Sequence, residues 1–184
     1  MCRRDIDGKS YVSLARNQHI PQYCGSCWAH AATSSITDRM KYMTKNVWPE
    51  HDLAIQVIMY CMKDTDNGCH GGLPIHIYQY ANEVGIPEEG CQRYEARDDE
   101  VCDDIHICRD CRKNQGCFAV QNYTKYYVEE FGHVEGVENI MKEIYAHGPV
   151  TCSIDVPMKN SSISATRSSR TSQTARRSSE EWTL

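Results

Sequence analysis

The chain has 184 residues with 20 basic and 25 acidic side chains, and 40% of its residues are apolar. This length allows one domain of ordinary size, or one domain and a fragment, and excludes two large domains. The apolar runs are short, so no segment has the roughly 20 apolar residues that cross a bilayer. A net charge of -5 gives no overall cationic field, which argues against nucleic acid and membrane surfaces as partners.

Three segments of the first half space their apolar residues as helices do. The first runs from Cys27 to Lys41, with Ser26 placed to cap its first turn. The second runs from about 52 to 61, and the third from about 74 to 83. The residues 85–87, Gly-Ile-Pro, supply a stop for the third helix.

The second half is less regular. Residues 91–117 are polar, carry five cysteines and show no sustained period, so we expect a loop ordered by cross-links. Residues 123–131 alternate like a half-buried strand, 137–145 return to helical spacing, and 150–156 look like a strand. Residues 158–184 are rich in Ser and Arg and cannot build a core, which predicts a disordered tail.

Eleven cysteines point to disulfides or to a bound metal. Because the number is odd, a fully paired disulfide framework leaves at least one thiol over. A zinc-stapled interaction module is the alternative. Its tetrahedral site would draw on His106 and the four cysteines nearest to it, Cys102, Cys108, Cys111 and Cys117.

Two features bear on the cellular compartment. Asn122-Tyr123-Thr124 and Asn160-Ser161-Ser162 fit the N-glycosylation acceptor pattern, which acts in the secretory pathway. The residues after Met1 lack the apolar run of a secretory signal peptide. We therefore expect the sequence to begin inside a mature domain.

The segment Cys24-Gly25-Ser26-Cys27-Trp28 admits three interpretations: a redox dithiol, half of a zinc site, or a nucleophile beside a structural cysteine. Here the second cysteine opens a helix, where unpaired N–H groups and the helix dipole stabilise a thiolate. This position favours Cys27 as a nucleophile.

The same segment resembles the signature of papain-like cysteine peptidases, as do Cys69-His70-Gly71-Gly72 and the Ile-Tyr-Ala-His-Gly-Pro run at 144–149. The run from Asn17 to Tyr23 resembles a carboxypeptidase branch of that family with a His-Ile-Pro insertion before its nucleophile. The resemblance covers about residues 5 to 156 and stops there. It implies an α+β fold of two lobes: a helical lobe at 1–148, and at 149–157 only the first strand of a β-rich second lobe.

The resemblance also implies roles for individual residues. Cys27 is the nucleophile, and Gln18 is the oxyanion-hole donor, chosen over Gln22 because the insertion lengthens the spacing to Cys27. His19 meets the terminal carboxylate of the substrate. Gly71 and Gly72 form the backbone edge that binds substrate. No cofactor is implied, and the expected partners are peptides or proteins with a free C-terminus and cysteine-protease inhibitors.

Family resemblance pairs eight of the cysteines and leaves Cys2, Cys27 and Cys152 over. It also places the protein in the lysosome or outside the cell. The implied disulfides are Cys24 with Cys69, Cys61 with Cys102, Cys91 with Cys108, and Cys111 with Cys117.

A catalytic His and an orienting Asn should follow the nucleophile by roughly 130–150 residues. No His follows His147, and Asn160 is the only later Asn. We therefore expect a cysteine-type carboxypeptidase by family whose activity is absent from these 184 residues. The alternative is a noncatalytic papain-like protein that binds partners or acts as a decoy.

Overall fold

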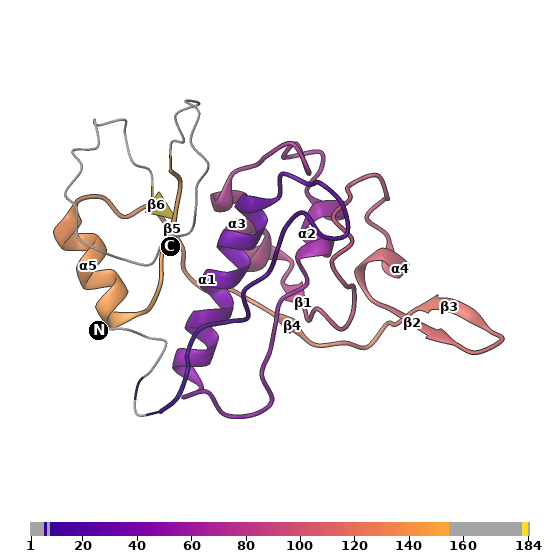
Figure 1. Cartoon of the computed structure of the whole chain (residues 1–184), viewed down its shortest axis with the longest axis horizontal. Helices are drawn as coiled ribbons and strands as arrows, with labels where there is room; N and C mark the ends of the chain where they lie inside the picture. The colour runs from indigo at the N-terminus through magenta and orange to yellow at the C-terminus, as the bar shows by residue number, and fades with distance from the viewer. Residues whose placement is uncertain (1–5, 7, 155–181, 184) are drawn as a thin grey trace.

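The computed structural model describes residues 6, 8–154 and 182–183. Three helices form the body of the molecule (Figure 1): α1 (Cys27–Met43), α2 (Ile55–Cys61) and α3 (Pro74–Glu83). Both α2 and α3 contact α1. The core between them is built from Trp28, Ala29, Ala32, Ile36, Ile55, Ile58, Met59, Ile77, Tyr78 and Ala81.

Helix α1 follows the predicted spacing and runs two residues beyond the predicted end at Lys41. Trp28, Ala32 and Ile36 are buried at intervals of four residues, so one face of the helix lies in the core. The chain then turns at Asn46, whose backbone is left-handed and whose N–H donates to the Lys41 carbonyl at 2.8 Å.

Helix α2 begins at Ile55, three residues later than predicted. The residues before it are extended and bond to the segment after α3. The Ala54 N–H donates to the Pro87 carbonyl at 2.9 Å, and the Glu89 N–H donates to the Asp52 carbonyl at 2.7 Å. This long-range pairing has no local sequence signal, which explains the error.

Helix α3 has the predicted bounds because both of its end signals are local. Pro74 occupies the first turn, and the N–H groups of Val84 and Gly85 both donate to the Tyr80 carbonyl. Gly85 has a φ of +79°, and a Cβ there would lie 2.8 Å from the Tyr127 ring. Glycine is therefore required at this stop.

Strand β1 (Ile86–Pro87) pairs antiparallel with β4 (Lys125–Tyr126). The predicted strand over 123–131 is wrong beyond these two residues. After β4 the chain follows α3 instead, since the Val128 N–H donates to the Ala81 carbonyl at 3.3 Å and the Asn82 amide donates to the Val128 carbonyl at 2.8 Å.

The cysteine-rich segment is more ordered than predicted. It contains the short helix α4 (Asp104–Ile107) and a hairpin of β2 (Arg109–Arg112) and β3 (Gly116–Ala119), which projects from the body (Figure 1). Most side chains of both strands are exposed, so no alternation of apolar and polar residues marks them. The prediction of a loop over residues 91–117 is wrong because these strands lack that alternation.

The described residues contain four disulfides, and they join the same four pairs that the family resemblance implies. The cysteines of the zinc alternative are all bonded to sulfur, so the interpretation as a zinc-stapled module is wrong. Within the described part of the chain, no group of three or more His, Cys, Asp or Glu could hold a metal ion.

The loops that these disulfides close differ in length, which predicts unequal contributions to stability. Cys24 and Cys69 are 45 residues apart, whereas Cys111 and Cys117 are 6 apart. The chain-entropy estimate gives about 4 kcal/mol for the first loop and about 2 kcal/mol for the second. Urea unfolding of the two double Cys→Ser variants should show this order, and equal losses would contradict it.

Helix α5 (Val137–Ala146) agrees with its predicted range and is joined to α1 through Arg39. The Arg39 side chain contacts Glu143 at 3.1 Å and donates to the Pro149 carbonyl at 2.9 Å. Strand β5 (Thr151–Cys152) pairs with β6 (Trp182–Thr183). It covers only part of the predicted strand over 150–156, and residues 155–181 lie outside the described residues.

Within the described ranges, no helix has the length and apolarity that a membrane span requires.

Candidate active site

Cys27 is the first residue of α1, and its side chain is exposed. A disulfide joins Cys24, just before the helix, to Cys69. The Gly25 N–H donates to the Cys69 carbonyl at 2.7 Å, and a Cβ on Gly25 would lie 2.6 Å from that oxygen. The turn that carries Cys27 is therefore clamped against the segment that begins at Cys69.

Trp28 contacts the same segment on both sides of Cys69, at Gly68 and at Gly72. Its indole N–H donates to the Gly68 carbonyl at 3.0 Å, and a Cβ on Gly72 would lie 2.6 Å from the indole ring. Gly71 has a φ of +116°, which favours glycine. The structure thus brings Gly71 and Gly72 beside the start of α1, with their backbone partly exposed.

Gln18 and His19 lie in the loop before Cys24. The Cys24 N–H donates to His19 Nδ1 at 3.4 Å, and the Gln18 amide nitrogen lies 3.3 Å from His19 Nε2. The exposed His19 ring stacks on Tyr23 with 4.6 Å between the ring centroids. The amide of Gln22 instead donates to the Ala96 carbonyl at 3.1 Å, away from Gln18.

Ser26 does not cap α1, so that prediction is wrong. The side chain is fully buried, and its hydroxyl lies 2.5 Å from the Tyr94 hydroxyl and 3.2 Å from His30 Nδ1. The Tyr94 hydroxyl also donates to the Gln18 carbonyl at 2.8 Å. Burial lowers the pKa of His30 below its usual 6.5, which favours the neutral ring.

A buried carboxylate lies under the glycine edge. Asp66 accepts the Leu73 N–H at 2.9 Å and contacts His76 Nδ1 at 3.0 Å. Its side chain is 4% exposed, and its Cβ is a near neighbour of Gly72. Asp66 and His76 thereby hold the turn between Gly72 and α3.

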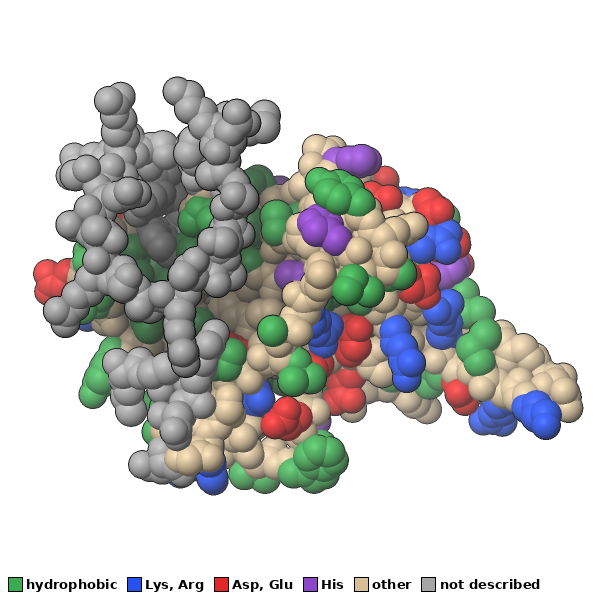
Figure 2. All heavy atoms as spheres, viewed as in Figure 1, with side chains coloured by type: hydrophobic (Ala, Val, Ile, Leu, Met, Phe, Trp, Pro, Cys, Tyr) green, Lys and Arg blue, Asp and Glu red, His purple; other side chains and the backbone are tan. Residues whose placement is uncertain are grey.

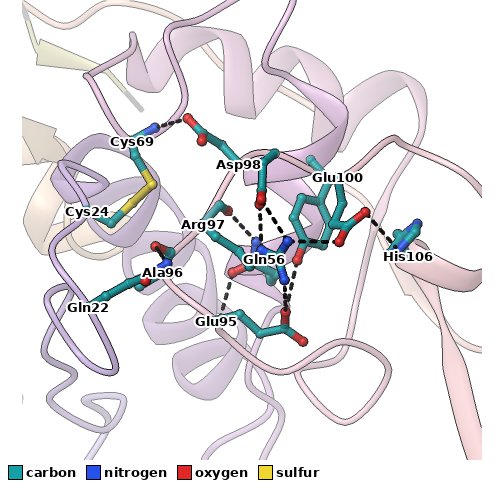
Figure 3. A network of polar contacts seen from close by, with 12 residues as sticks. Gln22, Cys24, Gln56, Cys69, Glu95, Ala96, Arg97, Asp98, Glu100 and His106 are labelled. Atoms are coloured by element: carbon teal, nitrogen blue, oxygen red, sulfur yellow. Dashed lines mark hydrogen bonds and ion pairs between the residues drawn. A yellow bond between two sulfur atoms is a disulfide. The ribbon is translucent and has the colours of Figure 1, made fainter.

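Residues 95–100 support the outer side of this region (Figure 3). Asp98 accepts the Cys69 N–H at 2.7 Å. The buried Gln56 donates to the Arg97 carbonyl at 2.6 Å and accepts the Glu95 N–H at 2.7 Å. Figure 2 shows acidic and basic side chains mixed over the surface near α4. Within residues 95–100, the Arg97 guanidinium contacts the Glu100 carboxylate at 2.9 Å.

Sequence reasoning missed Tyr94, His30, Asp66 and His76. Ser26 and Tyr94 are 68 positions apart, and only the motif at Cys27 has a local signal. The Asn122 side chain is exposed, as an acceptor of a glycan must be, whereas Asn160 lies outside the described residues. Cys27 and Cys152 take part in none of the four disulfides.

The site can supply a nucleophile and groups that hold a carbonyl. The exposed thiol of Cys27 stands at a helix N-terminus, where N–H groups lack helical partners. The amide of Gln18 and the bare backbone at Gly72 lie on segments tied to that turn. Such an arrangement suits attack on a carbonyl carbon and stabilisation of the oxygen as it gains charge.

Comparison with known proteins gives one consistent family. The model of the papain family cysteine proteases matches residues 3–177, beyond residue 156 where we expected the resemblance to stop. Cathepsin Z of Onchocerca volvulus is 44% identical over 151 residues, which cover 82% of this chain and 48% of that protein. Cathepsin B of Dictyostelium discoideum is 29% identical and is covered over 44% of its length.

Solved structures show the same fold at 24% identity. One is a chain from a study of the mite allergens Blo t 1 and Der p 1, with a TM-score of 0.59 over 76% of this chain and 41% of that one. Another is a Carica candamarcensis cysteine protease in complex with E-64, with a TM-score of 0.53 over 74% of this chain and 55% of that one. The α+β papain-like fold class is thereby confirmed.

Proposed function

Because this chain belongs to the papain family of cysteine proteases, we propose that it carries the nucleophile half of a carboxypeptidase similar to cathepsin Z, also called cathepsin X. The chain spans about half the length of the curated relatives it matches, 48% of the O. volvulus protein. The observation that carries the proposal is the exposed Cys27 thiol at the start of α1, clamped between the Gln18 loop and the glycine edge.

In this proposal the Cys27 thiolate attacks the scissile carbonyl carbon of a peptide. The Gln18 amide and the Cys27 N–H stabilise the negative charge that develops on the carbonyl oxygen. The backbone of Gly71 and Gly72 holds the peptide chain, since missing side chains allow it to approach closely. No cofactor takes part in these steps.

His19 would restrict cleavage to the C-terminus of the substrate. Its Nδ1 accepts the Cys24 N–H, so the hydrogen of the neutral ring is on Nε2, and the Gln18 amide 3.3 Å away must then turn its oxygen rather than its nitrogen toward that hydrogen. An exposed imidazole at this position can donate to a terminal carboxylate, and the protonated ring would add charge to that bond. Substrates would then be peptides or proteins with a free C-terminus, and cysteine-protease inhibitors would compete for the same site.

Turnover also needs a base, and no His follows His147 in the 184 residues. We therefore propose that residues 1–184 alone are inactive and that the base belongs to a second lobe. Residues 1–148 would be the helical lobe and 149–157 the first strand of that second lobe. The second candidate is a noncatalytic protein that binds substrates or inhibitors.

Four disulfides require an oxidising compartment for their formation, which supports a lysosomal or secreted location. A glycan on Asn122 would fit the same route, since its side chain is exposed.

Terminal specificity can be tested in a chimera in which the C-terminal half of O. volvulus cathepsin Z follows residue 156. We expect it to cleave a peptide with a free C-terminal carboxylate at least tenfold faster than the C-terminal amide. His19→Ala should lower that preference by roughly 10- to 100-fold, because one charge-assisted hydrogen bond is lost.

The matched control is His70→Ala, which removes another exposed histidine from the same region and should leave the ratio unchanged. Equal cleavage of acid and amide by the parent chimera would refute the carboxypeptidase proposal.

A further inference from the structure

A chain of hydrogen bonds joins the two segments that would form the oxyanion hole. The Tyr94 hydroxyl lies 2.8 Å from the Gln18 carbonyl oxygen and 2.5 Å from Ser26 Oγ. A carbonyl oxygen can only accept, so Tyr94 donates to Gln18 and the Ser26 hydroxyl donates to Tyr94. Ser26 immediately precedes Cys27, whose N–H is the other oxyanion donor in the proposed function.

His30 completes this chain from one turn further along α1. Its Nδ1 lies 3.0 Å from the Ser26 carbonyl oxygen and 3.2 Å from Ser26 Oγ. Because the Ser26 hydroxyl hydrogen points to Tyr94, both oxygens accept and Nδ1 carries the hydrogen. The His30 ring meets the Tyr94 ring edge to face, with centroids 4.8 Å apart at an interplanar angle of 88°.

The other ring nitrogen of His30 supports this protonation state. Nε2 is buried and has no hydrogen-bond partner, so a hydrogen placed on it would be unsatisfied. Burial is also the largest cause that lowers the pKa of His30. The neutral ring with its hydrogen on Nδ1 is therefore the form that fits the site.

These contacts fix the position of one oxyanion donor relative to the other. Gln18 lies on an exposed loop, whereas Ser26 is fully buried at the start of α1. An oxyanion hole works only when its donors are held in place before the charge develops. A loop that could shift against α1 would lose much of that effect.

We propose that Tyr94, Ser26 and His30, here called the Tyr94 network, are positioning residues that hold the Gln18 segment against the Cys27 turn. This inference rests on the proposed function, since it takes Gln18 and the Cys27 N–H as the oxyanion donors. None of the three side chains touches the substrate. They act through the backbone of Gln18 and of Ser26.

A test in the 184-residue chain needs a reaction that uses the oxyanion donors but no catalytic base. Reversible addition of a peptide aldehyde, acetyl-Phe-glycinal with a ¹³C-labelled aldehyde carbon, meets this need. The Cys27 sulfur bonds to the carbonyl carbon, the π pair of the C=O bond moves to the oxygen, and the thiol proton reaches that oxygen through solvent. The product is a thiohemiacetal, which the ¹³C resonance identifies.

We expect Tyr94→Phe to weaken aldehyde binding roughly tenfold, because the Gln18 carbonyl loses its donor and the buried Ser26 hydroxyl loses its acceptor. The rate of Cys27 alkylation by iodoacetamide, which forms no oxyanion, should stay within twofold. Tyr60→Phe is the matched control: it removes a tyrosine hydroxyl bond to Glu95, 3.1 Å long, outside the network. It should change neither quantity.

His30 supplies a second variant should Tyr94→Phe fail to fold. His30→Asn can keep a donor close to the position of Nδ1 and should bind the aldehyde like the parent, whereas His30→Leu should weaken binding to the level of Tyr94→Phe. A structural role alone would give no such rescue.

Two failures can be told apart by Gln18→Ala. If that variant weakens aldehyde binding but Tyr94→Phe and His30→Leu do not, the Tyr94 network does not position Gln18 and the inference is overturned. If Gln18→Ala has no effect while Cys27→Ser abolishes the thiohemiacetal, the role of Gln18 in the proposed function is wrong, and the inference falls with it.

Discussion

Residues 1–184 alone should cleave peptides with a free C-terminus at no measurable rate, whereas the chimera with the C-terminal half of O. volvulus cathepsin Z should be active. In the proposed function, the 184 residues keep a nucleophile and the donors of an oxyanion hole. They offer no imidazole after His147 to accept the thiol proton and return it to the leaving amine. A general acid or base contributes typically 10²–10⁴ in rate, and each acts here in a separate step.

Two histidines near Cys27, His30 and His19, are poor substitutes for that base. His30 Nδ1 is engaged by Ser26, and its Nε2 is buried. His19 Nδ1 accepts the Cys24 N–H. Neither ring therefore presents an exposed acceptor nitrogen toward the thiol while these contacts persist.

The assay compares the purified chain, the chimera and the Cys27→Ser form of each by mass spectrometry of the released residue. Cys27→Ser should abolish the activity of the chimera, and Cys152→Ser, which alters another cysteine outside the four disulfides, should not. Cleavage by the 184-residue chain that is lost on Cys27→Ser would show that the site contains its own base. An inactive chimera that still binds E-64 would favour the noncatalytic binding protein.

Local signals explain which parts of the fold could be predicted. Helix α3 begins at Pro74 and ends before Gly85, and both residues act on their own neighbours in sequence. Helix α1 is predicted from the helical spacing of its apolar residues. Family resemblance, rather than any local pattern, gave the disulfide pairs.

The remaining features depend on contacts between distant residues. Ala54 is extended because it bonds to Pro87, and the strand after Tyr126 ends because the chain turns along α3. The hairpin at Arg109–Ala119 has no signal in the sequence because most of its side chains face solvent, so burial leaves no pattern. Its register is instead marked by Cys111 opposite Cys117.

The candidate site likewise combines residues that local sequence motifs predict with residues that only long-range contacts bring together. Cys27, Gln18, His19 and the glycine edge belong to short motifs that a sequence displays directly. The side chains that support them belong to no such motif. Ser26 contacts Tyr94, which is 68 positions away, and Asp66 contacts His76 on the far side of the glycine edge. A serine beside a helix start is more often a cap than a buried link, so the local sequence predicts the wrong role for Ser26.

The second large effect is expected from removing the Gln18 amide, which the proposed function takes as the oxyanion donor in preference to Gln22. In the active chimera, Gln18→Ala should lower kcat by roughly 10²–10³, the loss expected when one oxyanion donor is removed. KM should change little, because the oxyanion forms only as the carbonyl is attacked.

Gln22→Ala is the matched control, since it removes an identical amide four positions away. That amide donates to the Ala96 carbonyl, so its loss should lower stability slightly and leave kcat within about twofold. Gln22 lies five positions before Cys27 and Gln18 lies nine positions before it, and the proposed role of Gln18 assumes that the inserted residues lengthen the spacing. A large fall in kcat for Gln22→Ala with a normal Gln18→Ala would mean that the insertion leaves the donor at Gln22.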